Sequence, residues 1–224
     1  LGYEFSPPVA PVVIPTCTNM QRFYPGPKGP ALQKQLSLGD HFVIGCSGTM
    51  NGWYLRKEML AFLSYLNENI KDSRLLVISQ ESHEELRHDA EEAGISPDRL
   101  TVARATFEEM PQLMRLMDVG VFFIKKCFSK QASCATKLGE FLATGVPVII
   151  NDGIGDTDDI VSEHNVGIVL SGFQRMDFGM ALEKLNQFRN DPDVQRRCRQ
   201  TAEQYFDLDT GVQNYANVYR RLKH

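Results

Sequence analysis

The sequence predicts an α/β fold, in which helices cover both faces of a parallel sheet and a helical tail follows. Two observations support this prediction. From residue 41 onward, short apolar runs alternate with stretches of helical periodicity, and the runs are almost continuous, as in strands buried on both faces. From residue 175 only helical patterns remain. In such a sheet, ligands bind at the carboxyl ends of the strands.

The expected elements follow in chain order. The strands are apolar runs at residues 41–47, 74–79, 100–105, 119–124, 146–150 and 166–170. Helices between them are expected at 53–70, 84–93, 107–117, from 136 to the turn at 145, and at 156–163. Three tail helices are marked by apolar residues near 182–188, 194–205 and 212–222. The alternation ends near residue 172, which separates the expected sheet domain, 41–172, from the tail, 173–224.

The stretch 136–151 contains the sharpest local signals. Its large apolar side chains stand three and four residues apart, at Leu138, Phe141 and Leu142. Gly145 suits the left-handed turn that ends many helices, and Pro147 prevents the helix from continuing. The β-branched run 146–150 then predicts a buried strand.

Two charges on this helix are not needed for its fold. Lys137 and Glu140 are three residues apart, so they share one side of the helix near its start. A helix N-terminus with a lysine suits an anion such as phosphate, and a carboxylate accepts hydrogen bonds from sugar hydroxyls. Together these features indicate a nucleotide or nucleotide-sugar site. The alternative is a surface ion pair of little energetic value.

Residues 136–149 read Thr-Lys-Leu-Gly-Glu-Phe-Leu-Ala-Thr-Gly-Val-Pro-Val-Ile. This stretch resembles the donor-binding signature of GT-B glycosyltransferases of the group 1, family 4 type. The resemblance implies a Rossmann-like sheet, the C-terminal half of a GT-B fold, with Glu140 on the ribose of the donor nucleotide. Ala132 stands where the family often has a second glutamate, which contacts the donor sugar. This departure leaves the donor sugar open.

Residues 1–40 do not have the pattern of a domain start. The stretch Val13–Pro25 resembles the interdomain hinge of GT-B enzymes, and Pro25–Pro30 is rich in proline and glycine. We therefore interpret residues 1–40 as a hinge remnant of a missing N-terminal, acceptor-binding domain. The alternative is an ordinary irregular N-terminus.

Two loops after strands are further candidates for donor binding. Gly48 and Thr49 lie in a loop whose glycines would let backbone N–H groups approach a phosphate, although a plain turn explains them equally well. Unlike the usual family loop, this one contains neither arginine nor lysine. Arg104 and Thr106 follow the third strand, in a stretch that lines the base pocket in the family.

Two more candidate groups flank the motif helix. Lys130, Ser133 and Thr136 precede or begin the helix and could bind phosphate oxygens, whereas capping of the helix by Thr136 is the simpler interpretation. Asp156 follows the fifth strand at a helix start. It could serve as an N-cap or lie near the donor sugar.

Composition excludes several classes of function. The net charge of −4 gives no electrostatic basis for nucleic-acid binding. The five cysteines lack Cys-x-x-Cys spacing, and the five histidines lack metal-ligand spacing, so we expect no metal site. Reduced thiols and the lack of a membrane-length apolar run favour a cytoplasmic protein.

The resemblance implies transfer of a sugar from a nucleotide diphosphate sugar to an acceptor hydroxyl, as in polysaccharide biosynthesis. It also implies retention of configuration and no cofactor or metal, with Lys137 and Glu140 as catalytic residues. The expected partners are the donor and the N-terminal domain, through which the whole protein could associate peripherally with membranes. This chain alone should be inactive. The alternatives are a nucleotide-sugar epimerase of the same fold and a noncatalytic nucleotide-binding domain.

Overall fold

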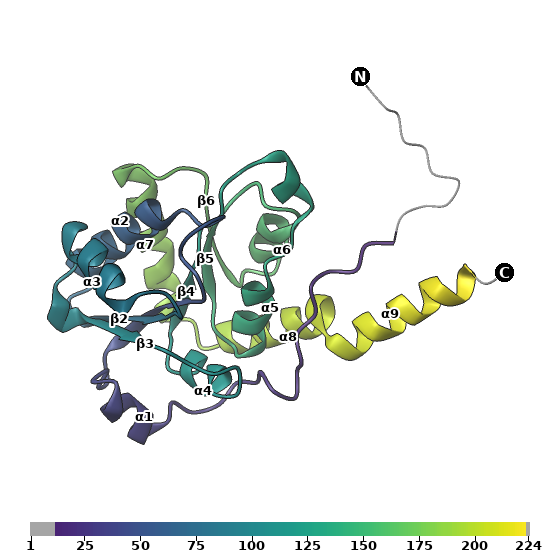
Figure 1. Ribbon diagram of the computed structural model, residues 1–224, viewed down its shortest axis with the longest axis horizontal. Coiled ribbons are helices and arrows are strands. Elements are labelled where there is room, and N and C mark those ends of the chain that lie inside the picture. The colour runs from purple at the N-terminus through teal and green to yellow at the C-terminus, as the bar shows by residue number, and fades with distance from the viewer. Residues whose placement is uncertain (1–11, 223–224) are drawn as a thin grey trace.

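The computed structural model describes residues 12–222 and contains one parallel sheet of six strands in the order β3-β2-β1-β4-β5-β6 (Figure 1). The strands are β1 (Phe42–Ser47), β2 (Ser73–Ile78), β3 (Leu100–Ala103), β4 (Val119–Val121), β5 (Val148–Asn151) and β6 (Gly167–Leu170). The central strands β4 and β5 are wholly buried, as their apolar runs predict. This arrangement confirms the predicted Rossmann-like α/β fold.

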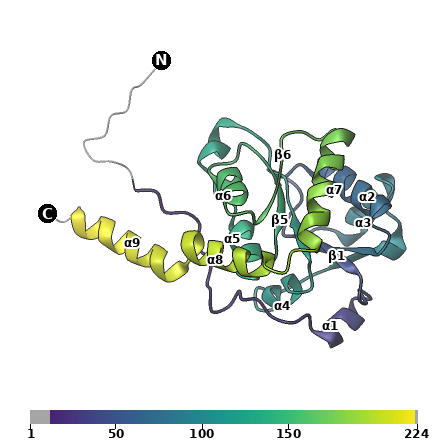
Figure 2. The ribbon, with the colours of Figure 1, turned by 180° about the vertical axis from the view of Figure 1, so that it is seen from behind.

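Helices cover both faces of the sheet (Figures 1 and 2). One face carries α2 (Arg56–Asn69), α3 (His83–Glu92) and α7 (Arg175–Arg189). The other face carries α4 (Met110–Met114), α5 (Thr136–Ala143) and α6 (Thr157–Glu163). Short 3-10 turns cover Pro97–Arg99 and Phe128–Ala132, and the small helix α1 (Pro30–Gln35) precedes the first strand.

The motif helix α5 packs tightly on the middle of the sheet. A Cβ at Gly120 of β4 would lie 2.7 Å from the ring of Phe141, so the helix can approach only because this strand position has no side chain. Gly145 has φ +82° and donates to the carbonyl of Leu142, while Val146 donates to that of Phe141. This pair of bonds is a Schellman motif, so the predicted helix end is confirmed.

The segment before the sheet packs against the tail helices. Thr18 donates its N–H to the carbonyl of Phe206 and accepts from the N–H of Leu208, at the junction of α8 (Val194–Phe206) and α9 (Leu208–Arg221). A Cβ on Gly139 of α5 would lie 2.5 Å from the Thr18 hydroxyl, so this segment also touches the motif helix. No strand of the sheet comes from residues 12–41. The expected apolar run from Val9 begins outside the described residues.

The three tail helices behave differently. The first, α7, packs on α2 and β6, and α8 packs on α5. The third, α9, points away from the sheet and buries only Gly211 (Figure 1). Three of its large apolar side chains, Val212, Tyr215 and Tyr219, are exposed, and so is Leu222 directly after it. Among the described residues, none of the helices combines the length and the apolar character that a membrane span requires.

Two predicted helices are shorter than expected, for local reasons. The helix expected from Trp53 begins at Arg56 because the preceding residues bond to the segment after β4: Leu55 donates to Phe123 and Lys125 donates to Trp53. The helix expected at 107–117 is reduced to α4, which has a proline in its first turn and continues into tighter turns at its end.

Candidate functional site

The start of α5 lies at the carboxyl edge of the sheet, where Lys137 is almost fully buried. Its side chain is 9% exposed, and its ammonium nitrogen lies 3.8 Å from the centroid of the Tyr54 ring. A Cβ added to Gly48 would lie 3.3 Å from this nitrogen, so the loop after β1 covers the lysine. The sequence motif on α5 and the glycine loop therefore meet at one place.

The charge of Lys137 is poorly compensated. None of the ion pairs formed by the described residues includes it. Burial lowers its pKa to about 8, and the nearby groups Cys46, Glu140 and Glu81 offset this fall only partly. A buried ammonium without an ion-pair partner is costly, which makes the position attractive to an anionic ligand. The alternative of a surface ion pair between Lys137 and Glu140 is not what the structure shows.

Glu140 occupies the same side of α5 but faces the segment before the sheet. Burial raises its pKa, while the charges of Lys137 and Arg22 lower it. Arg22 comes from that segment, and its guanidinium lies 3.6 Å from the centroid of the exposed Phe107 ring. Among the described residues the ion pair of Arg22 is with Glu108, at 3.7 Å, and its charge acts on Glu140 over a longer distance.

The backbone of the glycine loop is already hydrogen-bonded from within the protein. Glu81, which follows β2, accepts hydrogen bonds from the hydroxyl of Thr49 and from the N–H groups of Met50 and Asn51, at 3.3 and 3.2 Å. Gly48 donates its N–H to the carbonyl of Ile78. Glu81 was not predicted as a site residue; the only signal in the sequence is its place three residues after the end of a buried strand, at the carboxyl edge of the sheet.

A cavity of about 240 Å³ is lined in part by Tyr54. Lys130, Ser133 and Thr136 line it, together with the exposed Trp53, whose ring centroid is 4.6 Å from the ammonium of Lys130. Thr136 is the first residue of α5 and does not cap it, and within residues 12–222 no side chain accepts from the first N–H groups of this helix. Capping by Thr136 was the alternative, and it is not observed.

The other three predicted site residues do not line this cavity. Arg104 lines a hollow of about 160 Å³ beside α1 and α4. Thr106 is engaged with Glu109, which accepts from its N–H at 2.8 Å and donates its own N–H to the Thr106 hydroxyl. Asp156 precedes α6 without capping it and lines a hollow beside α8 and α9. The structure therefore brings Lys137, Glu140 and the glycine loop together, whereas Arg104, Thr106 and Asp156 lie outside this group.

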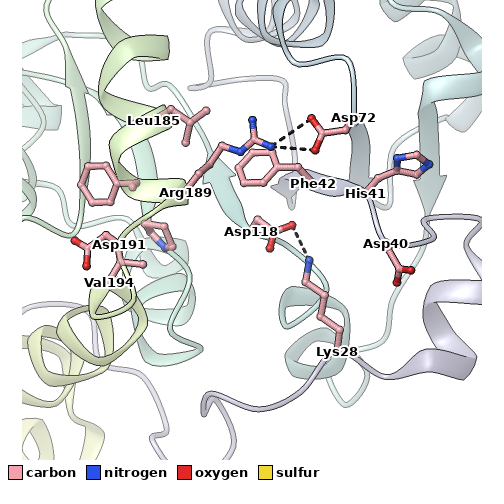
Figure 3. Close-up of a pocket in the computed structure, with 12 residues that line it drawn as sticks. Lys28, Asp40, His41, Phe42, Asp72, Asp118, Leu185, Arg189, Asp191 and Val194 are labelled. Carbon is pink, nitrogen blue, oxygen red and sulfur yellow. Dashed lines mark hydrogen bonds and ion pairs between the residues drawn. The ribbon is translucent and has the colours of Figure 1, made fainter.

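A further hollow, of about 400 Å³, lies at the opposite, amino edge of the sheet (Figure 3). Four of its charged side chains form two ion pairs: Lys28 with Asp118 at 2.6 Å, and Arg189 with Asp72 at 3.0 Å. Asp118 also accepts from the N–H of Val43. These bonds join the segment before β1, the sheet and α7, so we interpret the hollow as a structural junction. Within residues 12–222, no group of three His, Cys, Asp or Glu side chains could hold a metal ion.

The sheet order defines a Rossmann-like α/β protein, with a buried lysine at the carboxyl edge of the sheet. Residues 41–187 match the family model described as "Glycosyl transferases group 1". The match covers more than half of the chain, so the chain belongs to this family. No curated protein matches it significantly.

Solved structures of similar fold include proteins described as glycosyltransferases. HepE of Anabaena, in complex with UDP-glucose, has a TM-score of 0.74 at 16% identity, covering 92% of this chain and 56% of its own. Sucrose-phosphate synthase of Thermosynechococcus elongatus has a TM-score of 0.69 at 18% identity, and the match covers 93% of this chain and 52% of the synthase. The C-terminal domain of LpcC, a glycosyl transferase group 1 family protein of Francisella tularensis, has a TM-score of 0.57 at 18% identity. This match covers 84% of this chain and 95% of the LpcC domain. The chain thus spans about half the length of the first two and nearly all of the third.

Proposed function

We propose that this chain is the donor-binding domain of a glycosyltransferase, which transfers a sugar from a nucleotide diphosphate sugar to an acceptor hydroxyl. The observation that carries the proposal is the buried Lys137 ammonium, which has no ion-pair partner among residues 12–222 and lies at the start of α5, where none of these residues provides a side-chain cap. A diphosphate would supply the missing negative charge. The UDP-glucose complex of HepE, a protein of the same fold, supports this choice of ligand.

Lys137 and Glu140 have different roles in this proposal. Lys137 and the first N–H groups of α5 hold the diphosphate and stabilise the negative charge that develops as it leaves. Glu140 accepts hydrogen bonds from ribose hydroxyls and fixes the donor in place. Catalysis then consists of positioning and electrostatic stabilisation. We further propose retention of configuration without a metal ion, on the basis of the sequence resemblance.

The acceptor and the rest of the catalytic cleft would belong to another domain. Because the chain spans 52–56% of two enzymes of similar fold, we propose that an acceptor-binding domain completes the site and that this chain alone binds the donor without transferring its sugar. The exposed apolar residues of α9 offer a surface for that domain. The five free cysteines favour a cytoplasmic protein, and peripheral membrane association would come from the second domain.

One observation favours a second candidate, a noncatalytic nucleotide-binding domain. Ala132 occupies the motif position where a carboxylate would contact the donor sugar, and its small apolar side chain cannot take that role. Such a domain would bind the nucleotide without supporting transfer.

Thermal unfolding with a panel of nucleoside diphosphates tests nucleotide binding. A ligand present at 100 times its Kd should stabilise the chain by about 2.7 kcal/mol. If none of the diphosphates shifts the transition, the proposed function fails. Donor hydrolysis and transfer by the full-length protein then separate the candidates, because the noncatalytic domain predicts binding with neither reaction.

A further inference from the structure

The carboxylate of Glu81 occupies the place in the glycine loop where an anion would bind. One oxygen accepts from three donors of the loop: the Thr49 hydroxyl and the N–H groups of Met50 and Asn51. Converging backbone N–H groups of this kind are what a phosphate-binding loop offers to its ligand. Here they are used by the protein itself.

A partly buried arginine lies beside this carboxylate. Arg56, at the start of α2, lies 3.7 Å from the second oxygen of Glu81 and 2.6 Å from Asp89 of α3. The side chains of Arg56 and Glu81 are only 13% and 18% exposed. The three groups carry a net charge of −1, so the loop is lined by negative charge and not by the arginine and lysine usual in related loops.

This negative charge lies near the lysine of the candidate site. Glu81 is close enough to Lys137 to raise the pKa of that ammonium, and Gly48 of the same loop touches the lysine side chain. A diphosphate held by Lys137 would therefore lie near a carboxylate, and the two would repel each other.

We propose that Glu81 fills the anion position of loop 47–52 from within the protein, so that the diphosphate is directed to Lys137 and the start of α5 and binds less tightly than it otherwise would. The inference rests on the proposed function, because it concerns how the same ligand is held. Glu81 is a positioning residue in this account: it shapes the loop and limits the affinity for the diphosphate without touching the ligand.

The test is a calorimetric comparison of Glu81→Gln with the parent chain, using UDP, GDP and ADP and their nucleosides. Glutamine keeps a hydrogen-bond acceptor for the loop but removes the charge. We expect the variant to bind the preferred diphosphate about three- to tenfold more tightly and the nucleoside equally well. Glu84→Gln, an exposed change of the same kind on α3, should alter neither affinity.

The outcomes separate the two proposals. If the parent binds a diphosphate and Glu81→Gln binds it equally or more weakly, this inference is overturned while the proposed function stands. If the parent binds no diphosphate, both fall together. A crystal structure of the parent with the diphosphate gives an answer that does not depend on the variant folding: Glu81 should still accept from Met50 and Asn51, and a phosphate oxygen in its place would refute the inference.

Discussion

The ammonium of Lys137 lies 3.8 Å from the centroid of the Tyr54 ring, beside the loop that follows the first strand. The contact is favourable for a cation, but it replaces little of the hydration that the charge loses on burial. The net result is a pKa of about 8 for Lys137, well below its ordinary value near 10.5. Binding and stability should therefore both depend on pH.

Diphosphate affinity should fall as the pH rises through 8. The protonated lysine is the form that attracts the diphosphate, and with a pKa of about 8 its population drops by about tenfold between pH 7 and pH 9. Calorimetric titrations across this range should show a loss of affinity of similar size for the parent, and a flat profile for Lys137→Met. A parent profile that is equally flat would contradict a charged role for Lys137.

Lys137→Met should stabilise the chain in the absence of ligand. Because the pKa is lowered in the fold, the charged form is disfavoured there, and this penalty is present below pH 8 and fades as the pH rises towards 10.5. The fall from 10.5 to about 8 corresponds to at most about 3 kcal/mol. Urea unfolding at pH 7 should show a gain, which shrinks steadily as the pH rises from 8 to 10.5. Lys57→Met, on the exposed side of α2, is the control, and a loss of stability in Lys137→Met would refute the prediction.

Glu140→Gln should remove discrimination between ribose and deoxyribose. An ionised carboxylate accepts from both ribose hydroxyls, whereas an amide oxygen is a weaker, uncharged acceptor. We expect roughly tenfold weaker binding of the ribonucleotide, little change for the 2′-deoxynucleotide, and an unchanged unfolding midpoint. Calorimetry with the two ligands measures the difference. A variant that discriminates as well as the parent would exclude the ribose contact.

Arg199 of α8 should be a stability residue that acts on the geometry of α5. Its guanidinium donates to the carbonyls of Phe23 at 2.6 Å, Ala143 at 3.1 Å and Met20 at 3.1 Å, which join the segment before the sheet to the end of the motif helix. Arg199→Ala should cost about 2–4 kcal/mol in urea unfolding, because several carbonyls lose a charged donor. Arg196→Ala removes an exposed pair on the same helix and should cost less than about 1 kcal/mol; equal costs would rule out the bridging role.

The parts of the structure that depend on local sequence were predictable. Apolar runs located all six strands, and Gly145 and Pro147 located the end of α5. Both features depend on residues that are close together in the sequence. The position of Lys137 at the carboxyl edge followed from the parallel sheet. Its burial did not follow, since it depends on Tyr54, which is distant in sequence.

The remaining features depend on contacts between distant segments. Glu81 meets the glycine loop 30 residues away in sequence, so no local pattern marks it as a partner of Asn51. The start of α2 is displaced because Leu55 bonds to Phe123, which again is a nonlocal effect. Lys137 and Glu140 remain predicted site residues whose roles require ligand binding to test.

The central claim is that Lys137 holds the diphosphate of a nucleotide sugar, and the most direct test compares a nucleoside with its diphosphate on the parent and on Lys137→Met. A charged hydrogen bond contributes about 1.5–3 kcal/mol, so the account predicts a loss of tenfold or more in calorimetric affinity for the diphosphate and no loss for the nucleoside. Equal losses for the two ligands, or no loss for either, would contradict it.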